Sequence, residues 1–521
     1  MKLASLKKLR VVISLIFFIS ITALFLDYGN ILSPKFTNYF VYLQFIPSIL
    51  KFIGIKNISF IGFIFVVIIT ITFGRVYCST ICPLGILQDV LSYLARKIKK
   101  KKYYSNLKPY KILRYSFLVL PLVFLFFGSI FFINLLDPYS NFGRINTWLF
   151  KPVLIWFHNY AASILIQNKI YLISPVELFF VKTYLILFPL AFFSLIAFMS
   201  LRQGRIYCNT VCPVGTLLGL ISKFSIFKIQ IEKSNCISCK LCERVCKSGC
   251  IDRKNKLIDF DRCVNCYNCL TVCPTDGIKY KFRFDHHLNS EIKEVDYKKR
   301  KFIASIIFFI SGLSTLTRAQ KKIVSKLPSK ISIFKKFPVS PPGSLSLKHF
   351  TEKCTACHLC VSSCPSQVIQ PSFLEYGFLG MLQPRMDYNV SFCNYDCVIC
   401  TEVCPSGAIL PIQLSKKKLT QLGKAKFVKD NCIVYTEKTD CGACSEHCPT
   451  KAVNMIPYVN NLVIPEVSEE YCIGCGACEY SCPVKPYKAI YVEGNYVHLT
   501  AKKKEVKKID EKVDYKQDFP F

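Results

Sequence analysis

Acidic residues are scarce in this chain of 521 residues, which has 33 Asp and Glu against 68 Lys and Arg and a formal net charge of +35. A basic balance of this size suggests nucleic-acid binding as one alternative. However, 52% of the residues are hydrophobic, and the lysines flank apolar runs of membrane length. This placement favours anchoring at a membrane and argues against a nucleic-acid partner.

Other familiar patterns are also missing. The first apolar run leads into a chain that stays apolar, so we expect no cleavable secretory signal. No general acid/base or nucleophile constellation is found outside the cysteine motifs, so chemistry on a final substrate is assigned to a partner protein. The 29 cysteines are an odd number in a long chain, which argues against a complete disulfide framework.

Most of the cysteines form six quartets, and five of the quartets end before Pro. Four quartets have the spacing Cys-x2-Cys-x2-Cys-x3-Cys, one opens with x3 at Cys393, and one has eight residues between Cys432 and Cys441. This spacing is typical of [4Fe–4S] ligation, in which three close thiolates surround one cluster and the fourth often reaches a neighbouring one. Zinc sites usually separate two ligand pairs by a longer loop. The sequence therefore predicts six [4Fe–4S] clusters, with these ligands: Cys236, Cys239, Cys242 and Cys246; Cys263, Cys266, Cys269 and Cys273; Cys354, Cys357, Cys360 and Cys364; Cys393, Cys397, Cys400 and Cys404; Cys432, Cys441, Cys444 and Cys448; and Cys472, Cys475, Cys478 and Cys482.

The first two quartets lie close together and indicate a two-cluster ferredoxin domain in residues 236–292. With the usual exchange of the fourth ligand, Cys273 completes the first cluster and Cys246 completes the second. The first quartet departs from the pattern because Lys247 replaces Pro and Cys250 follows it. The fourth ligand of the second cluster is therefore either Cys246 or Cys250.

Residues 1–235 have the pattern of a membrane domain. Apolar runs at 11–26, 58–74, 115–136 and 178–200 are long enough to cross a bilayer. The loop 96–114 carries nine Lys and Arg and no acid, so we expect the amino terminus, this loop and the first ferredoxin domain on the cytoplasmic side. The expected fold class is a membrane α-helical bundle of four or five transmembrane helices with an internal repeat, joined to α+β ferredoxin-like [4Fe–4S] domains.

The repeat rests on two copies of one motif, GRVYCSTICPLG at 74–85 and GRIYCNTVCPVG at 204–215. Each copy follows an out-going helix, an external aromatic segment and a returning helix. At positions i and i+4 its two cysteines could share one face of a helix that continues from the span. We expect the four cysteines of the two copies to meet at the membrane edge, either as ligands of a further cluster or as redox-active thiols: Cys78, Cys82, Cys208 and Cys212.

Ionisable residues near the outer ends of spans are candidates for a quinone or proton site, because such groups are costly in lipid. Asp27 and Asp137 occupy corresponding positions after the first and third spans and are the strongest pair. His158, Glu177 and Lys182 also qualify, although an interfacial charge explains each of them equally well.

Residues 293–349 decide the topology. The apolar stretch 302–316 is short for a fifth span and has basic residues on both sides. If it crosses the membrane, the domain that follows lies outside, which we favour; if it lies along the interface, that domain stays in the cytoplasm. The Pro-rich run 337–346 is expected to be a semi-rigid linker.

The last four quartets define a four-cluster ferredoxin domain in residues 350–500, followed by a charged tail at 501–521. Cys354, Cys357 and His358 also match the Cys-x2-Cys-His pattern of haem attachment. We disfavour haem because these cysteines belong to a complete cluster quartet.

The doubled GRxYCxxxCPxG motif, followed by two cluster motifs, resembles the membrane components of quinol dehydrogenases of the NapH type, which are related to the NosR and CcoG polyferredoxins. Residues 350–495 resemble the NapG/MauM-type ferredoxins that partner them, so the chain looks like a natural fusion of the two. The resemblance implies an electron-transfer subunit of the inner membrane that takes electrons from quinol and passes them to a terminal reductase. It leaves two alternatives, an assembly factor for a respiratory metalloenzyme and a one-sided cytoplasmic polyferredoxin.

Overall fold

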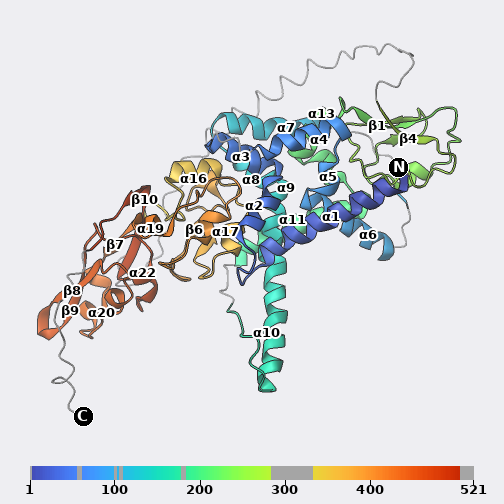
Figure 1. The fold of residues 1–521 in the computed structure, drawn as a ribbon. Coiled ribbons are helices and arrows are strands. Elements are labelled where there is room, and N and C mark those ends of the chain that lie inside the picture. Colours follow the sequence, from blue (N-terminus) through green and yellow to red (C-terminus); the bar gives the residue numbers. More distant parts are fainter. Residues whose placement is uncertain are drawn as a thin grey trace.

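The computed structural model describes residues 3–55, 61–98, 103–104, 110–177, 183–282 and 332–504. These residues form a helical part, a first cysteine-rich part (227–282) and a second cysteine-rich part (332–504) (Figure 1). The predicted fifth span at 302–316, Lys182 and the tail beyond residue 504 lie outside the described residues.

The helical part contains only helices among its described residues. Its elements are α1 (Leu3–Leu26), α2 (Pro34–Tyr42), α3 (Phe45–Ile55), α4 (Gly62–Phe73), α5 (Tyr77–Thr80), α6 (Pro83–Ile98), α7 (Lys111–Phe126), α8 (Phe131–Leu136), α9 (Pro138–Ile145), the π-helix η2 (Asn146–Phe150), α10 (Lys151–Gln167), α11 (Thr183–Gln203), α12 (Ile206–Thr210) and α13 (Pro213–Ser222).

Three helical stretches among the described residues are long and apolar enough to cross a membrane, namely Ser5–Leu26, Pro138–Gln167 and Leu185–Gln203. The first and third of these match the predicted spans 11–26 and 178–200. The predicted spans 58–74 and 115–136 correspond to shorter helices, α4 with 12 residues and α7 with 16 residues. Four or five spans therefore remain a prediction.

The stretch Pro138–Gln167 falls where the sequence predicted an external aromatic segment. It consists of α9, η2 and α10, and Figure 1 shows α10 extending away from the other helices. Many of its apolar side chains are exposed, among them Trp156 and Phe157. Its Asn159 side chain donates to the Val176 carbonyl and accepts from the Val176 amide, both at 2.8 Å, which holds the following segment against it.

The first cysteine-rich part contains short strands and one short helix: β1 (Phe227–Ile231), α14 (Leu241–Val245), β2 (Ile251–Asp252), β3 (Leu257–Ile258) and β4 (Ile278–Phe282). Strand β1 pairs antiparallel with β4, and β2 with β3. Because β1 closes this unit, the unit begins at Phe227, before the predicted boundary at residue 236. Leu6 of α1 packs against its core, and Lys7 Nζ donates to Thr271 Oγ1 over 3.5 Å.

The second cysteine-rich part has the same small scale of structure, with two-stranded antiparallel sheets and helices of one or two turns. Strand β7 pairs with β10, β5 with β6, and β8 with β9. The elements are α16 (Leu347–Lys353), α17 (Leu359–Ser362), β5 (Ile369–Pro371), η4 (Phe378–Gly380), β6 (Pro384–Met386), α18 (Ile399–Glu402), α19 (Leu414–Lys417), β7 (Thr420–Phe427), η5 (Lys429–Asn431), α20 (Ile433–Thr436), α21 (Ala443–Glu446), β8 (Val453–Pro457), η6 (Val459–Asn461), β9 (Val463–Val467), α22 (Ala477–Ser481) and β10 (Ile490–Thr500).

The Pro-rich run 337–346 differs from the linker that the sequence suggested. Residues 339–344 are buried, so this run is part of the folded unit. The Met386 amide donates to the Val339 carbonyl over 2.9 Å, and the Leu410 amide donates to the Gly343 carbonyl over 2.9 Å. The run is therefore held by backbone hydrogen bonds to Met386 and Leu410.

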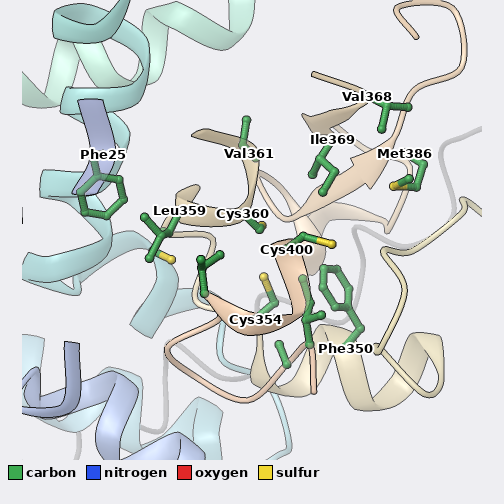
Figure 2. Packing of buried hydrophobic residues seen from close by; sticks show 14 of the residues in the cluster. Phe25, Phe350, Cys354, Leu359, Cys360, Val361, Val368, Ile369, Met386 and Cys400 are labelled. Carbon is green, nitrogen blue, oxygen red and sulfur yellow. The ribbon is translucent and has the colours of Figure 1, made fainter. Parts of the chain in front are cut away.

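The second cysteine-rich part is attached to the carboxyl end of α1. Ser362 Oγ donates to the Phe25 carbonyl over 2.5 Å, and Lys151 Nζ donates to Ser362 Oγ over 2.9 Å. Figure 2 shows Phe25 of α1 beside Leu359, next to the cysteines of the first quartet of this part. Further contacts come from α9 and η2, where Arg144 Nε donates to the Ala356 carbonyl over 2.9 Å.

The two cysteine-rich parts therefore contact opposite ends of one apolar helix. The first lies at the amino end of α1 and the second at its carboxyl end. With 24 residues, α1 is about 36 Å long, which is enough for the hydrocarbon core of a bilayer.

Substitution of Trp148 tests this attachment between α1, η2 and the second cysteine-rich part. Its Nε1 donates to Nδ1 of the buried His358 over 2.7 Å, and His358 Nε2 bonds to the Leu382 carbonyl at 2.8 Å. Trp148→Phe removes the donor and leaves a buried ring nitrogen without a partner, which costs about 1–3 kcal/mol. We expect a lower melting temperature of the second part in detergent. The matched control, Trp156→Phe, changes an indole that is 60% exposed and should leave the melting temperature unchanged; equal effects of the two variants would contradict the contact.

Candidate metal centres and the membrane cysteine site

In the first cysteine-rich part, the structure brings the predicted ligands together in two hollows. One hollow, of about 440 Å³, is lined by Cys236, Cys239, Cys242 and Cys273, together with backbone from both quartets. Cys273 comes from the second quartet, so its position here matches the exchange of fourth ligands that the sequence suggested. The ligand roles themselves stay predictions.

The second hollow, of about 330 Å³, has five cysteines in its wall: Cys246, Cys250, Cys263, Cys266 and Cys269. The sulfurs of Cys246 and Cys250 are 3.5 Å apart, so both candidates for the fourth ligand reach the same site. The choice between them therefore stays open.

In the second cysteine-rich part, the fourth cysteine of one quartet again lies with the first three cysteines of another. Cys364 joins Cys393, Cys397 and Cys400 around a hollow of about 320 Å³. Cys482 joins Cys432, Cys441 and Cys444 around another of about 360 Å³. In the remaining two groups, Cys404 lies near Cys354 and Cys357, and Cys448 lies near Cys472 and Cys478.

The backbone around the regular quartets fits an anionic cluster. In four quartets, the residues directly before and directly after the second cysteine both have positive φ. Ala356 and His358, on either side of Cys357, are one such pair. Alternating right- and left-handed residues turn successive amide protons toward one point, and such concave nests bind iron–sulfur clusters. The other pairs are Ser238 and Lys240, Asn265 and Tyr267, and Gly474 and Gly476.

Amide groups also donate directly to cysteine sulfurs. The amides of Ala452, Ala425 and Ile409 reach the sulfurs of Cys448, Cys472 and Cys404 over 3.2 to 3.4 Å. Hydrogen bonds to sulfur are one of the means by which proteins hold and tune iron–sulfur clusters. These features fit [4Fe–4S] clusters, which would supply one-electron transfer when bound; the number of six clusters stays a prediction. In the part of the chain that the structure describes, no three His, Cys, Asp or Glu side chains are grouped closely enough for a single metal ion.

The four cysteines of the doubled motif are also brought together, although not as expected. Gly74 and Gly204, with φ of +80° and +55°, end the preceding helices, so the cysteines do not share one face of a continuing helix. Instead, Cys78 and Cys208 lie in the short helices α5 and α12, while Cys82 and Cys212 precede α6 and α13. All four are buried, and Cys82, Cys208 and Cys212 each lie close enough to other cysteines of the set to interact with them electrostatically.

The two motif copies contact each other reciprocally through their arginines. Arg75 Nη2 lies 3.9 Å from its own Cys78 sulfur and donates to the Cys208 carbonyl over 3.3 Å. Arg205 Nη1 lies 3.9 Å from its own Cys208 sulfur and donates to the Cys78 carbonyl over 2.6 Å. Both guanidinium groups are completely buried.

The last glycine of each copy allows this close approach. A Cβ at Gly85 would lie 2.4 Å from the Cys78 carbonyl oxygen and 2.5 Å from Arg205 Nη1. A Cβ at Gly215 would lie 2.3 Å from the Cys208 carbonyl oxygen. The Pro-x-Gly ending of the motif therefore keeps room for the arginine of the other copy.

Asp89 joins this site to the first cysteine-rich part. Its carboxylate is paired with Arg205 at 2.8 Å, Lys247 at 3.1 Å and Arg10 at 3.1 Å. Burial would raise the pKa of Asp89, but the three cations outweigh burial and hold the pKa of this carboxyl well below its usual range. Lys247 is the residue that replaces Pro after Cys246, so the irregular quartet supplies a cation to the membrane cysteine site.

The candidate quinone residues have structural partners. Asp27 accepts from the amides of Ile31 and Leu32, and Asp137 caps α9 by accepting from the Ser140 amide over 2.9 Å. His158 packs edge-on against Tyr28, and the Glu177 carbonyl accepts from Gln367. Asp27 thus shapes the turn after α1, and Asp137 shapes the turn between α8 and α9. A quinone or proton role for Asp27 and Asp137 stays a prediction.

His358 is held in a way that leaves no free ring nitrogen. Nδ1 accepts from Trp148 and Nε2 bonds to a carbonyl, so the ring is neutral. Burial, together with the nearby Arg144 guanidinium, lowers the pKa of His358 to about 3. The histidine of the haem-like pattern therefore serves the contact between the helical part and the second cysteine-rich part.

Sequence reasoning missed the charged residues around the membrane cysteines. Arg75 and Arg205 stood in the repeated motif as a shared Gly-Arg pair, and that repetition was the available signal. Asp89 and Gln88 carried no signal, because a single carboxylate or amide on a helix is usually an ordinary surface residue.

Comparison with protein families gives three matches. A 4Fe-4S binding domain model matches residues 58–102 and 185–232, which include both copies of the doubled motif. Two models of 4Fe-4S dicluster domains match residues 353–409 and residues 235–278 and 431–486. Several [4Fe–4S] ferredoxin domains are present in this chain.

Similar proteins agree with these matches. The chain is 24% identical over 273 residues to the ferredoxin-type protein NapH of Haemophilus influenzae, covering 51% of this chain and 79% of the relative. It is 25% identical over 244 residues to an uncharacterised protein of Methanocaldococcus jannaschii, covering 46% of this chain and 78% of the relative. It is 23% identical over 214 residues to the putative electron transport protein YccM of Escherichia coli, covering 40% of this chain and 51% of the relative. These similarities support an iron–sulfur electron-transfer role.

Removal of the Asp89 charge should destabilise the protein. Asp89→Asn leaves three buried cations without their carboxylate, and breaking a buried ion pair costs about 3–5 kcal/mol. We expect a lower melting temperature of the purified protein in detergent. Glu470→Gln serves as the control, because its partner Lys502 is exposed and such pairs contribute about 0–1 kcal/mol. Equal melting temperatures of the two variants would contradict the role of Asp89.

The exchange of fourth ligands predicts how much iron is lost when two cysteines are substituted together. If Cys364 and Cys393 bind the same cluster, Cys364→Ser and Cys393→Ser should each remove about four iron atoms per chain, and the double variant should remove no more. The control pair, Cys360→Ser with Cys393→Ser, should remove about eight, because these cysteines bind different clusters. Iron analysis of anaerobically purified protein measures this; a loss of eight in the first pair would rule out the exchange.

Proposed function

We propose that this protein carries electrons across the inner membrane, from a quinol to a partner reductase, on six [4Fe–4S] clusters bound by its cysteine quartets. The observation that carries the proposal is the attachment of the two cysteine-rich parts to opposite ends of α1. If α1 crosses the bilayer, one part lies on each side. The first part then faces the cytoplasm and the four-cluster part faces outward.

Charge supports this orientation. The basic residues near the first cysteine-rich part include Arg96, Lys97 and Arg114, and Arg114 Nη2 donates to the Asp261 carbonyl of that part over 2.7 Å. Positive residues collect on the cytoplasmic side of membrane proteins. The segment between α8 and α11 carries fewer cations, namely Arg144, Lys151 and Lys169 among its described residues.

The second part is arranged as a chain of sites that leads away from α1. The quartet site nearest to α1 contains Cys354, and the next contains Cys393. The Cys393 amide donates to the Cys475 carbonyl over 2.9 Å, which connects the second site to the third. Figure 1 shows this part extending away from the helices, with β8 and β9 at its far end. Such an arrangement suits a partner that docks far from the membrane.

Quinol as the donor rests on the resemblance to NapH-type components, and the relation to NapG-type ferredoxins makes the chain a fusion of two partner proteins. The protein itself contributes binding of the clusters, exclusion of water from the sulfurs and a fixed distance between the two parts. It would act as a subunit of a quinol dehydrogenase system.

The topology can be tested with two epitope insertions. One is placed at Asn255 in the turn between β2 and β3, and the other at Asn460 in the turn between β8 and β9; both residues are exposed. In intact spheroplasts, we expect external protease to cut at Asn460 and not at Asn255. Lysed cells provide the control, in which both sites must be cut. Protection of both sites in spheroplasts would support the one-sided polyferredoxin instead.

The donor can be tested separately. In membranes that contain the protein, a quinol analogue should bleach the visible absorption of the oxidised clusters, and a partner reductase should restore it. Protein that reduces only copper or another metal, without a response to quinol, would favour the assembly-factor alternative.

A further inference from the structure

The four cysteines of the doubled motif lie in the packed core that connects the two cysteine-rich parts. Cys78, Cys82 and Cys212 belong to the same buried cluster as Val264 of the first part and Cys357 of the second. On one side, Arg75 Nη1 donates to the Asp261 carbonyl over 3.0 Å, next to the second hollow of the first part. The site therefore directly adjoins that part.

The other side of the site leads toward the second part. Tyr207, the neighbour of Cys208, donates from its hydroxyl to the Leu136 carbonyl over 3.0 Å. Leu136 ends α8, and α9 follows with Arg144, whose Nε donates to the Ala356 carbonyl. The cysteine site is thus connected by buried contacts to the quartet that begins at Cys354.

Several donors converge on the sulfurs of this site. Gln88 Nε2 donates to the Cys208 sulfur over 3.3 Å, and the Gly215 amide donates to the Cys212 sulfur over 3.3 Å. The two guanidinium groups approach Cys78 and Cys208 at 3.9 Å. Amide and guanidinium donors around sulfur are the surroundings of a metal-bound thiolate, and they offer little to a disulfide, which carries no charge.

Arg75 requires an anion. Its guanidinium is 0% exposed, and its other partners are an amide oxygen and backbone carbonyls. Among the described residues, no carboxylate lies within ion-pair distance of Arg75, whereas Arg205 has Asp89. A buried charge is tolerated only when it is paired, so the negative charge must come from the cysteines.

We propose that Cys78, Cys82, Cys208 and Cys212 bind a seventh iron–sulfur cluster inside the membrane domain, and that Arg75 and Arg205 balance its charge. An oxidised [4Fe–4S] or [2Fe–2S] core with four thiolates has a net charge of −2, which two guanidinium groups neutralise. The exchange is a single electron: a reduced cluster of one neighbouring part is oxidised as this cluster is reduced, and no bond forms or breaks.

The role of this cluster rests on the function proposed above. The hydrocarbon core is about 30 Å thick, and electron tunnelling weakens exponentially with distance, so clusters on opposite faces need a carrier between them. A cluster at the doubled motif, which adjoins the first part and is linked to the second part through α8 and α9, would be the next carrier on this route.

Iron and sulfide content of the full-length protein, purified anaerobically, tests the site. The double variant Cys78→Ser with Cys208→Ser should lose about four iron atoms per chain if the cluster is [4Fe–4S], or about two if it is [2Fe–2S]. Thr210→Ala serves as the control, because Thr210 is buried in the same helix as Cys208 and bonds only to the Ile206 carbonyl; it should keep all the iron. Unchanged iron in the double variant would overturn the proposal and indicate redox-active thiols.

The arginine role has its own readout. Arg75→Gln removes a positive charge beside the cluster and should lower the midpoint potential of one signal in electron paramagnetic resonance, because reduction adds negative charge. Arg75→Lys should restore most of the potential. Loss of iron or no shift in both variants would contradict a charge-balancing role.

The experiments distinguish a wrong cluster site from a wrong transport function. If both epitopes of the topology test are protected but the double cysteine variant still loses iron, the site exists and the transmembrane function is wrong. If the topology is as proposed but vesicles of the double variant still transfer electrons at the full rate, the site is not the carrier.

Discussion

Negative charge on sulfur has to be compensated wherever the protein removes it from water, and this requirement shapes every part of the chain. In four quartets of the cysteine-rich parts, left-handed residues turn backbone amides inward, where they can compensate this charge. In the membrane part, where the cysteines belong to two distant segments, it comes from the arginines of the two motif copies. Negative charge on sulfur is thus compensated by backbone amides in the cysteine-rich parts and by arginine side chains in the membrane part.

The compensating charges also connect the parts. Arg205 is shared between the Cys208 sulfur and Asp89, and Asp89 in turn binds Lys247, which directly follows Cys246 of the first quartet. At the other end of α1, Arg144 and Trp148 hold Ala356 and His358, which surround Cys357. Residues next to predicted cluster ligands therefore make the contacts that hold the parts together.

The cysteine quartets, the first apolar helix and the doubled motif could be predicted from the sequence, because each depends on residues that are close together in the chain. Spacing of a few residues determines which cysteines can surround one cluster, and the position of Cys273 beside the first quartet was predicted from the usual geometry of such quartets. The matching position of Cys364 beside Cys393 was not predicted. The apolar run of α1 and the doubled motif were equally visible. These signals lie within short windows of the chain.

Contacts between segments that are far apart in the chain could not be predicted from the sequence. Nothing local showed that Gly74 would end a helix and place Cys78 against the other motif copy, or that Asp89 would gather cations from three segments. The Pro-rich run 337–346 was taken for a linker because its composition is that of a linker, whereas burial against Leu410 and Met386 makes it part of the fold.

The most direct measurement is a cryo-electron microscopy structure of the whole protein in a lipid nanodisc. The expected result is a bilayer that crosses α1 between the two cysteine-rich parts, with one part on each face. A bilayer that leaves both parts on the same face would contradict transport of electrons across the membrane.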